Sequence, residues 1–394
     1  MRTPWIAFAL LLWSLLPAAA QDSSFTLSGD LTASMALTAD EALFGGIKFA
    51  PVTASSALHA VLSFARSYRA LGLLDFTFTD SDLLAHADGA MLETLSFDVN
   101  QFYADLNFSD LFYLRAGKQR LKWGAGWVFN PSDPVNPPKD PTATRQTTEG
   151  VPALKAELIT TLISFAAFTV AYDRLANFGV GGKVSSSTLP GSDLSLSAYW
   201  SQTDSWTAAL NLSVAPLYAL PGWDTVQLWL EGCLYGEPRY LEVPPAASPS
   251  GLQHSLLAGV SATLPGIRTS ILAEYYRLSE GLTLAEEQLV SDTKGSKALA
   301  VRPGRLGKDY AFLSLTQGSI TDNGHPLFDH IGLSSSLLLN ITDLSLLARH
   351  GISTAFIGDS AVDLSVAWAA GGESSEFGNL VSAVSVELEL KVFY

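Results

Sequence analysis

The sequence predicts an all-β protein, a transmembrane antiparallel up-and-down β-barrel, and three observations lead to this class. The composition is intermediate, with 15% charged residues, 48% hydrophobic residues and a mean hydropathy of +0.23. An export signal opens the chain, and segments that alternate between apolar and polar residues continue to its end. Soluble domains contain about 25% charged residues, and membrane helices are more apolar. Barrel strands lie between these two cases because only every second residue faces lipid.

The first 20 residues have the parts of a secretory signal peptide. Arg2 supplies the positive charge, residues 5–16 form an apolar run, and residues 17–20 (Pro-Ala-Ala-Ala) provide small residues for cleavage. The apolar run is shorter than the stretch of about 20 apolar residues that a membrane anchor needs. We therefore expect a signal peptide at 1–20 and a barrel at 21–394, with the mature chain beginning at Gln21.

Charge and cysteine content exclude several classes of function. Without Arg2 the chain has 22 basic residues (23 − 1) and 38 acidic residues, a formal charge of −16. Nucleic acid is bound by clustered Lys and Arg, so such an acidic chain is unsuited to it. Cys233 is the only cysteine, which excludes a disulfide framework and a cysteine-based metal site. We expect Cys233 to be a structural thiol.

The clearest strand is the last one, at 384–394. Apolar residues occupy every second position, and Ser385, Glu387, Glu389 and Lys391 lie between them. About 11 tilted strand residues cross a bilayer. The end of the apolar face resembles the C-terminal signal by which outer-membrane barrels are recognised for assembly; it consists of Leu390, Val392 and Tyr394.

Other segments repeat this pattern at strand length. They lie at 25–35, 58–68, 73–79, 92–108, 111–119, 193–201, 206–216, 225–235, 254–264, 267–278, 310–318, 331–341, 344–356 and 361–370. The stretch 158–172 must contain a turn that has no Gly or Pro, and 36–57 lacks clear alternation. At roughly 22 residues per strand and connection, and with the even counts that bacterial barrels favour, we expect 16 to 18 strands.

The lengths of the connections agree with a barrel in the outer membrane of a two-membrane bacterium. If the last strand descends to the periplasm, the long polar segments 120–150, 236–253, 279–307 and 371–379 fall on the outer side. Three short Leu-Pro-Gly turns, at 189–191, 220–222 and 264–266, fall on the inner side. Long outer loops and short inner turns are typical of these barrels.

One motif stands out at 114–137, with the sequence LRAGKQRLKWGAGWVFNPSDPVNP. It resembles a signature of porin-like and capsule-associated outer-membrane barrels: Arg-x-Gly-Lys/Arg-Gln, then Trp-Gly, then Asn-Pro-x-Asp and Asn-Pro. The matching positions are Arg115, Gly117, Lys118, Gln119, Trp123, Gly124, Asn130, Pro131, Asp133, Asn136 and Pro137. The resemblance implies a barrel that conducts small solutes or binds surface polysaccharide.

The motif also has a physical interpretation. Arg115 and Gln119 share a strand face that we expect to line the lumen, because an Arg facing lipid at mid-bilayer costs about 2–4 kcal/mol. We expect the loop 120–150 to fold inward and narrow the pore, with a local positive field. The constriction candidates are Arg115, Lys118, Gln119, Arg120, Lys122 and Asp133. In the alternative, the motif only ties the loop to the wall, through Gly117, Trp123, Gly124, Asn130, Pro131, Asn136 and Pro137.

No catalytic pattern is present, and we expect no enzyme, cofactor or metal. The sequence lacks HExxH and Gly-x-Ser-x-Gly. His325 and His330, with Asp329 between them, lack a third ligand, and Asp80 with Asp82 alone is weak support for a divalent ion.

Three functions therefore stay open. The first is a porin-like channel for passive diffusion of small hydrophilic solutes; the second is a polysaccharide-binding barrel or adhesin; the third is a barrel hydrolase. A barrel of about 16 strands leaves a water channel unless a loop plugs it, which favours the first. The expected partners are outer-membrane lipid, the barrel-assembly machinery, and small solutes or surface polysaccharide, with a homo-oligomer left open.

Overall fold

The structure is a computed structural model of the 394-residue chain. It describes residues 23–40, 48–49, 53–66, 70–81, 95–108, 110–136, 149–172, 177–188, 190–202, 205–220, 225–237, 251–264, 268–287, 304, 306–320, 328–355, 359–372, 375–378 and 384–394. The expected signal peptide, Asp82, Pro137 and His325 lie outside these residues.

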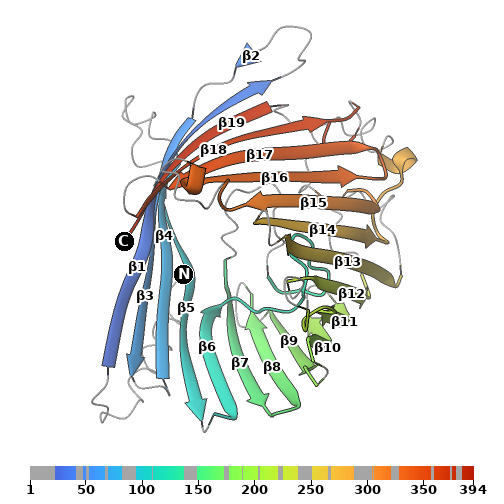
Figure 1. Cartoon of the computed structure of the whole chain (residues 1–394). Coiled ribbons are helices and arrows are strands. Elements are labelled where there is room, and N and C mark those ends of the chain that lie inside the picture. The colour runs from blue at the N-terminus through green and yellow to red at the C-terminus, as the bar shows by residue number, and fades with distance from the viewer. Residues whose placement is uncertain are drawn as a thin grey trace.

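The described residues form a closed antiparallel β-barrel (Figure 1). Eighteen strands make its wall: β1 (Ser23–Asp40), β3 (Thr53–Arg66), β4 (Ala70–Asp80), β5 (Leu95–Phe108), β6 (Phe112–Gln119), β7 (Val151–Ile159), β8 (Ile163–Ala171), β9 (Phe178–Ser186), β10 (Ser192–Ser201), β11 (Ser205–Val214), β12 (Gln227–Tyr235), β13 (Gln253–Leu264), β14 (Thr269–Leu278), β15 (Asp309–Gln317), β16 (Ile331–Asn340), β17 (Ser345–Ala355), β18 (Ser360–Ala370) and β19 (Val384–Phe393). A two-residue strand, β2 (Lys48–Phe49), extends one end of β1. The predicted fold and strand count are confirmed.

Each wall strand pairs with the next, and the barrel closes where β1 pairs with β19. The register of this seam runs from Asp30 opposite Phe393 to Ala39 opposite Val384. On its other edge β1 pairs with β3. Closure leaves no unpaired sheet edge, which a strand-built membrane protein requires.

Alternation along the strands separates an apolar outer face from a lumen face. On β12, Leu228, Leu230 and Leu234 are exposed, whereas Trp229 and Glu231 between them are buried. Successive strand side chains point to opposite faces, so the leucines face outward and the glutamate faces inward. No helix within the described ranges combines the length and apolar character needed to cross a membrane.

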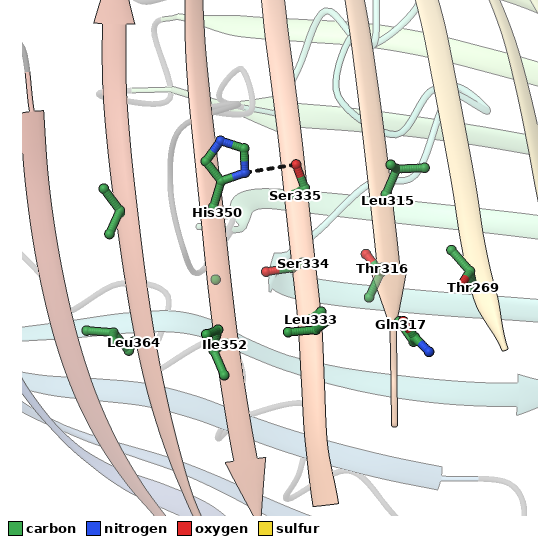
Figure 2. Close-up of a pocket in the computed structure, with 12 residues that line it drawn as sticks. Thr269, Leu315, Thr316, Gln317, Leu333, Ser334, Ser335, His350, Ile352 and Leu364 are labelled. Atoms are coloured by element: carbon green, nitrogen blue, oxygen red, sulfur yellow. Dashed lines mark hydrogen bonds between the residues drawn. The ribbon is translucent and has the colours of Figure 1, made fainter. Parts of the chain in front are cut away.

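A polar pair lies in a shallow hollow of about 460 Å³ on the outer wall between β14 and β18 (Figure 2). His350 lies at the middle of β17, and its Nδ1 is 3.0 Å from Ser335 Oγ on β16. Its ring also stacks with Trp368 on β18 at 6.4 Å. The hydrogen bond and the ring contact make a polar imidazole tolerable on an otherwise apolar face.

The sequence prediction left β9 unassigned and did not divide 151–172 into two strands. The expected turn without Gly or Pro is confirmed at 160–162, where Thr160 Oγ1 donates to the Ile163 carbonyl at 2.6 Å. The alternation of β9 is weak because two of its lumen-facing positions are glycines. A Cβ at Gly179 would overlap the Tyr199 ring, and one at Gly181 would overlap the ring of Phe168.

Antiparallel order places the long connections after β6, β12, β14 and β18 at one end of the barrel, which we call the long-loop end. The Leu-Pro-Gly turns follow β9, β11 and β13, at the opposite end. That the long-loop end faces outward stays a prediction.

Candidate pore and its inward segment

After β6 the chain turns into the barrel. Residues 120–136, which we call the inward segment, cross the interior toward β12 and β13 (Figure 1). Four apolar side chains of this segment are buried against the inner wall: Leu121, Trp123, Phe129 and Val135. The lumen of the eighteen-strand barrel is therefore not empty, because the connection after β6 occupies part of it.

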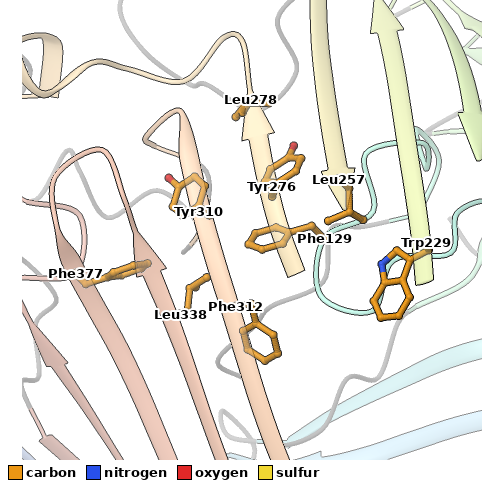
Figure 3. Close-up of a cluster of buried hydrophobic side chains, with 9 residues drawn as sticks. All are labelled: Phe129, Trp229, Leu257, Tyr276, Leu278, Tyr310, Phe312, Leu338 and Phe377. Carbon is orange, nitrogen blue, oxygen red and sulfur yellow. The ribbon is translucent and has the colours of Figure 1, made fainter. Parts of the chain in front are cut away.

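Phe129 anchors the segment to the wall made by β13 to β16 (Figure 3). Its ring stacks on Tyr276 of β14 with centroids 4.6 Å apart and an interplanar angle of 18°. Tyr310 on β15 lies at 6.0 Å. Leu257 and Leu338 complete the contact, and both are buried. Burying an aromatic side chain of this size contributes on the order of 2 kcal/mol or more.

Trp123 forms a second anchor on the other side of the segment. Its indole meets Phe168 of β8 edge to face at 4.7 Å, and the cluster continues to Val170 and Tyr199. The Trp123 carbonyl accepts a hydrogen bond of 2.9 Å from Lys183 Nζ of β9. The two aromatic anchors thus attach the segment to opposite flanks of the β7–β16 wall.

Between the anchors, two wall carboxylates hold the backbone. Glu231 Oε1 accepts hydrogen bonds from the Ala125 N–H and, at 2.6 Å, from the Gly126 N–H. Glu274 accepts from the N–H groups of residues 127, 128 and 129, at 2.6, 2.9 and 3.2 Å. Both glutamates are buried, with 0% and 3% of their surface exposed. Sequence reasoning missed them, although a Glu within an apolar strand segment indicates a lumen-facing position.

The polar residues of the motif bond within the segment. Asp133 Oδ1 accepts from the backbone N–H of Asn136 at 3.0 Å, and Asn136 Nδ2 donates to Asp133 Oδ2 at 2.7 Å. Asn136 also bonds both backbone groups of Leu121, and Asn130 Nδ2 donates to Asp133 Oδ2 at 3.3 Å. Pro131 is buried beside them. This arrangement closes the segment into a compact loop.

Steric contacts explain why two positions of the motif are glycine. Gly117 has φ +129°, and a Cβ there would overlap the Phe102 carbonyl of β5. A Cβ at Gly124 would lie 2.5 Å from Glu231 Oε1 and would overlap Asn130. Only glycine permits these approaches.

Gln119, predicted to line the pore, is fully buried. Its Nε2 donates to the Ala153 carbonyl of β7 at 2.9 Å. It therefore supports the root of the inward segment.

Three of the predicted basic residues have acidic neighbours. Arg115 Nε donates to Asp105 Oδ2 at 3.1 Å, and its guanidinium lies 4.3 Å from the centre of the Tyr103 ring. Lys118 pairs with Glu149. The Arg120 guanidinium is 3.8 Å from Asp75. Their positive charge is consequently balanced close to the wall.

Lys122 has different surroundings. Together with Lys155 of β7 and Lys183 of β9 it lines a hollow of about 100 Å³ beside Trp123. Lys155 also contacts Glu157 at 2.7 Å. Three lysines and one glutamate, Glu157, line this hollow, which we call the positive side of the inward segment; the charges of Asp193 and Glu231 also act on Lys183. Lys155 and Lys183 were missed because they lie in strands outside the motif.

A half-buried histidine, His59, links the wall to both roots of the segment. His59 Nδ1 is 3.1 Å from Asp30 and His59 Nε2 is 3.0 Å from Asp75. Asn100 Nδ2 donates to Asp75 Oδ1 at 2.9 Å, and the Asn100 carbonyl accepts from the Gly150 N–H at 2.8 Å. The two hydrogen bonds to carboxylates fix the orientation of the imidazole.

The remaining inner wall is lined by partly accessible charges. Arg349 of β17 pairs with Glu387 of β19 at 2.8 Å, and their side chains are 22% and 28% exposed. Lys391 of β19 pairs with Asp363 of β18 at 2.8 Å. By contrast, wall residues behind the inward segment, such as Tyr276, are almost fully buried. These partly accessible inner-wall charges therefore lie on β17 to β19, away from the strands that hold the inward segment.

At the long-loop end, buried acids join other connections to the wall. Glu376 accepts from Tyr310 Oη at 2.8 Å, Asn340 Nδ2 at 2.9 Å and the Gly304 N–H at 2.8 Å. Glu287 is fully buried nearby, and burial, with the charges of Asp343 and Glu376, raises its pKa to about 9. Within the described residues, no three His, Cys, Asp or Glu side chains are arranged to hold a metal ion.

Comparison with solved structures finds the same fold. The chain is similar to Pseudomonas aeruginosa OccK3 (OpdO), with a TM-score of 0.60, 10% identity and coverage of 98% of this chain and 99% of that one. Acinetobacter baumannii OccAB1 gives 0.56 and 10%, covering 95% and 97%. The outer membrane protein OprD of Pseudomonas aeruginosa gives 0.50 and 9%, covering 96% and 95%. No protein-family model matches the sequence, and no curated protein matches it.

Fold and interior together define a class of protein, an eighteen-strand barrel whose lumen is narrowed on one side by a wall-anchored loop. The structural neighbours are barrels of the OprD/Occ porin type. At these identities the likeness establishes the fold, and the function is argued below.

Proposed function

We propose that this chain is an outer-membrane channel for passive diffusion of small hydrophilic solutes. One observation carries the proposal: the inward segment fills one side of an eighteen-strand lumen, while the wall from β17 to β7 keeps accessible charged pairs such as Arg349–Glu387. A wall of this size encloses water unless it is plugged. The neighbour OprD is an outer membrane protein, which supports the location.

The inward segment acts as the constriction in this proposal. Its positive side is formed by Lys122, Lys155 and Lys183, because Arg115 and Lys118 are paired with acids. Field lines concentrate in narrow pores with low-dielectric walls. We therefore expect anions to be favoured locally, although the whole chain is acidic. A channel of this kind needs no catalytic residue or cofactor.

Single-channel recording of the folded protein in a planar bilayer tests this function. We expect stable, stepwise conductance. When Lys122 and Lys155 are both changed to Gln, we expect the reversal potential to shift in the direction that reports a weaker preference for anions. Reversal potential reports ion preference, and conductance reports the size of the path. Silence from protein shown to be folded and inserted would contradict the channel and favour a barrel that binds surface polysaccharide.

A further inference from the structure

Five consecutive backbone N–H groups of the inward segment point at two carboxylates. Those of residues 125 and 126 reach Glu231, and those of residues 127, 128 and 129 reach Glu274. Ser132 Oγ donates to Glu231 Oε2 at 3.0 Å, and Trp229 Nε1 donates to Glu274 Oε1 at 3.1 Å. Successive N–H groups that converge on an anion form a nest, and here the anion belongs to the opposite wall.

The dependence is mutual. Within the described part of the chain, neither Glu231 nor Glu274 has a Lys, Arg or His within ion-pair distance. A buried carboxylate without a cation needs hydrogen-bond donors, and the inward segment supplies most of them. The N–H groups of residues 125–129 belong to a segment that is not part of a strand. They therefore need acceptors other than a neighbouring strand. Removing either side leaves buried polar groups without partners.

The apolar anchors alone would not give the segment one position. Contacts of Phe129 and Trp123 are non-directional, and they lie at either side of the nest. Hydrogen bonds prefer a narrow range of distance and angle. The glutamates therefore determine the path of residues 124–129, including the placement of Trp127, whose indole is 57% exposed.

We propose that Glu231 and Glu274 are positioning residues that set the size and ion preference of the pore. They act through the inward segment and need no contact with the solute. Both oxygens of Glu274 accept backbone bonds, so an amide, with one acceptor oxygen, cannot replace the carboxylate. This inference rests on the proposed channel function.

Conductance of Glu274→Gln and Glu231→Ala barrels provides the first test. We expect an open-channel conductance about 1.5-fold or more above wild type with added current noise, because the segment no longer holds one position. The matched control is Glu280→Gln at the start of the connection after β14, a buried glutamate that accepts a hydrogen bond of 2.9 Å from Tyr235 Oη. It removes the same single charge, so we expect its conductance to stay near wild type. Heat-modifiable migration in gels confirms that each variant is a folded barrel.

A second measurement does not depend on conduction. In a Cys233→Ser background, Val128→Cys is labelled with a water-soluble maleimide; Val128 is partly buried against the Phe129 cluster. We expect labelling to accelerate about threefold or more when Glu274→Gln is added, because local opening governs the access of reagent. If wild type is silent but labelling accelerates, the channel function fails and the positioning role stands. Equal conductance and equal labelling in Glu274→Gln, Glu231→Ala and the Glu280→Gln control would overturn the inference.

Discussion

Glu287 shows how strongly a single side chain at the long-loop end depends on its surroundings. It lies in the helical residues 284–287 and has no exposed surface. Burial raises its pKa from the ordinary 4.5 to about 9, and the charges of Asp343 and Glu376 add to the effect. The carboxyl is therefore neutral at pH 7, which avoids a further buried carboxylate charge beside Asp343 and Glu376.

Because of Glu287, the free energy of unfolding of the barrel will fall as the pH rises. A raised pKa means that the folded state holds the proton more tightly than the unfolded chain. The stabilisation is complete below pH 4.5 and is lost as the pH rises through 9. Between pH 7 and 10 we expect a loss on the order of 2 kcal/mol, seen as a lower urea midpoint. Glu287→Gln removes this slope, and an unchanged slope in that variant would refute the assignment.

The neighbouring Glu286 provides the control. Its carboxylate accepts from the Thr283 N–H and Oγ1, both at 2.7 Å, and these bonds lower its pKa. Stability from a lowered pKa is present above the ordinary value and is lost only toward acid. Glu286→Gln is therefore expected to destabilise by the same amount at pH 7 and pH 10.

At the scale of the element, the inward segment combines apolar anchors with the carboxylate nest. Phe129→Ala removes the ring that stacks on Tyr276, and truncating a buried Phe costs about 3–5 kcal/mol. The backbone bonds of the barrel are not involved. We expect a folded, heat-modifiable barrel with a noisy, enlarged conductance.

Phe78→Ala is the comparison for that experiment, because Phe78 of β4 is 41% exposed on the outer face. Its removal leaves the lumen unchanged, and we expect wild-type conductance. A Phe129→Ala channel with wild-type conductance and noise would mean that the glutamates alone hold the segment.

The elements that sequence predicts well are those whose two faces differ in polarity. The terminal strand β19 alternates almost without error because lipid lies on one side and lumen charges on the other. β9 was missed because Gly179 and Gly181 leave room for rings of neighbouring strands. Its pattern depends on what β8 and β10 supply, which local alternation does not record.

The same reason limits prediction of the site. The motif indicates where the chain leaves the wall, and the loop root at Gln119 follows β6 as predicted. The acceptors of its N–H groups are Glu231 and Glu274, separated from it by 105 to 147 residues. Such pairs become neighbours only through the register of the closed barrel.

The whole barrel depends on one seam, where β19 meets β1. Tyr394 exchanges backbone hydrogen bonds of 3.1 Å with Gly29, and its hydroxyl donates to the His59 carbonyl of β3 at 3.1 Å. A Cβ at Gly29 would lie 2.5 Å from the Tyr394 hydroxyl oxygen. The ring therefore lies across the glycine and spans three strands. Its surface is 51% exposed.

Tyr394→Ala separates closure of the seam from recognition during assembly. The backbone bonds to Gly29 need no side chain, and the lost hydroxyl bond is worth about 1 kcal/mol. We expect the variant to refold in detergent almost as well as wild type. If Leu390, Val392 and Tyr394 form an assembly signal, as the sequence predicts, its amount in the outer membrane falls several-fold. Tyr218→Ala, which removes a 53% exposed tyrosine from the connection after β11, at the same end of the barrel but away from the seam, serves as the control. Equal losses in refolding and in cells would assign Tyr394 to the seam, and no loss in either would remove it from both roles.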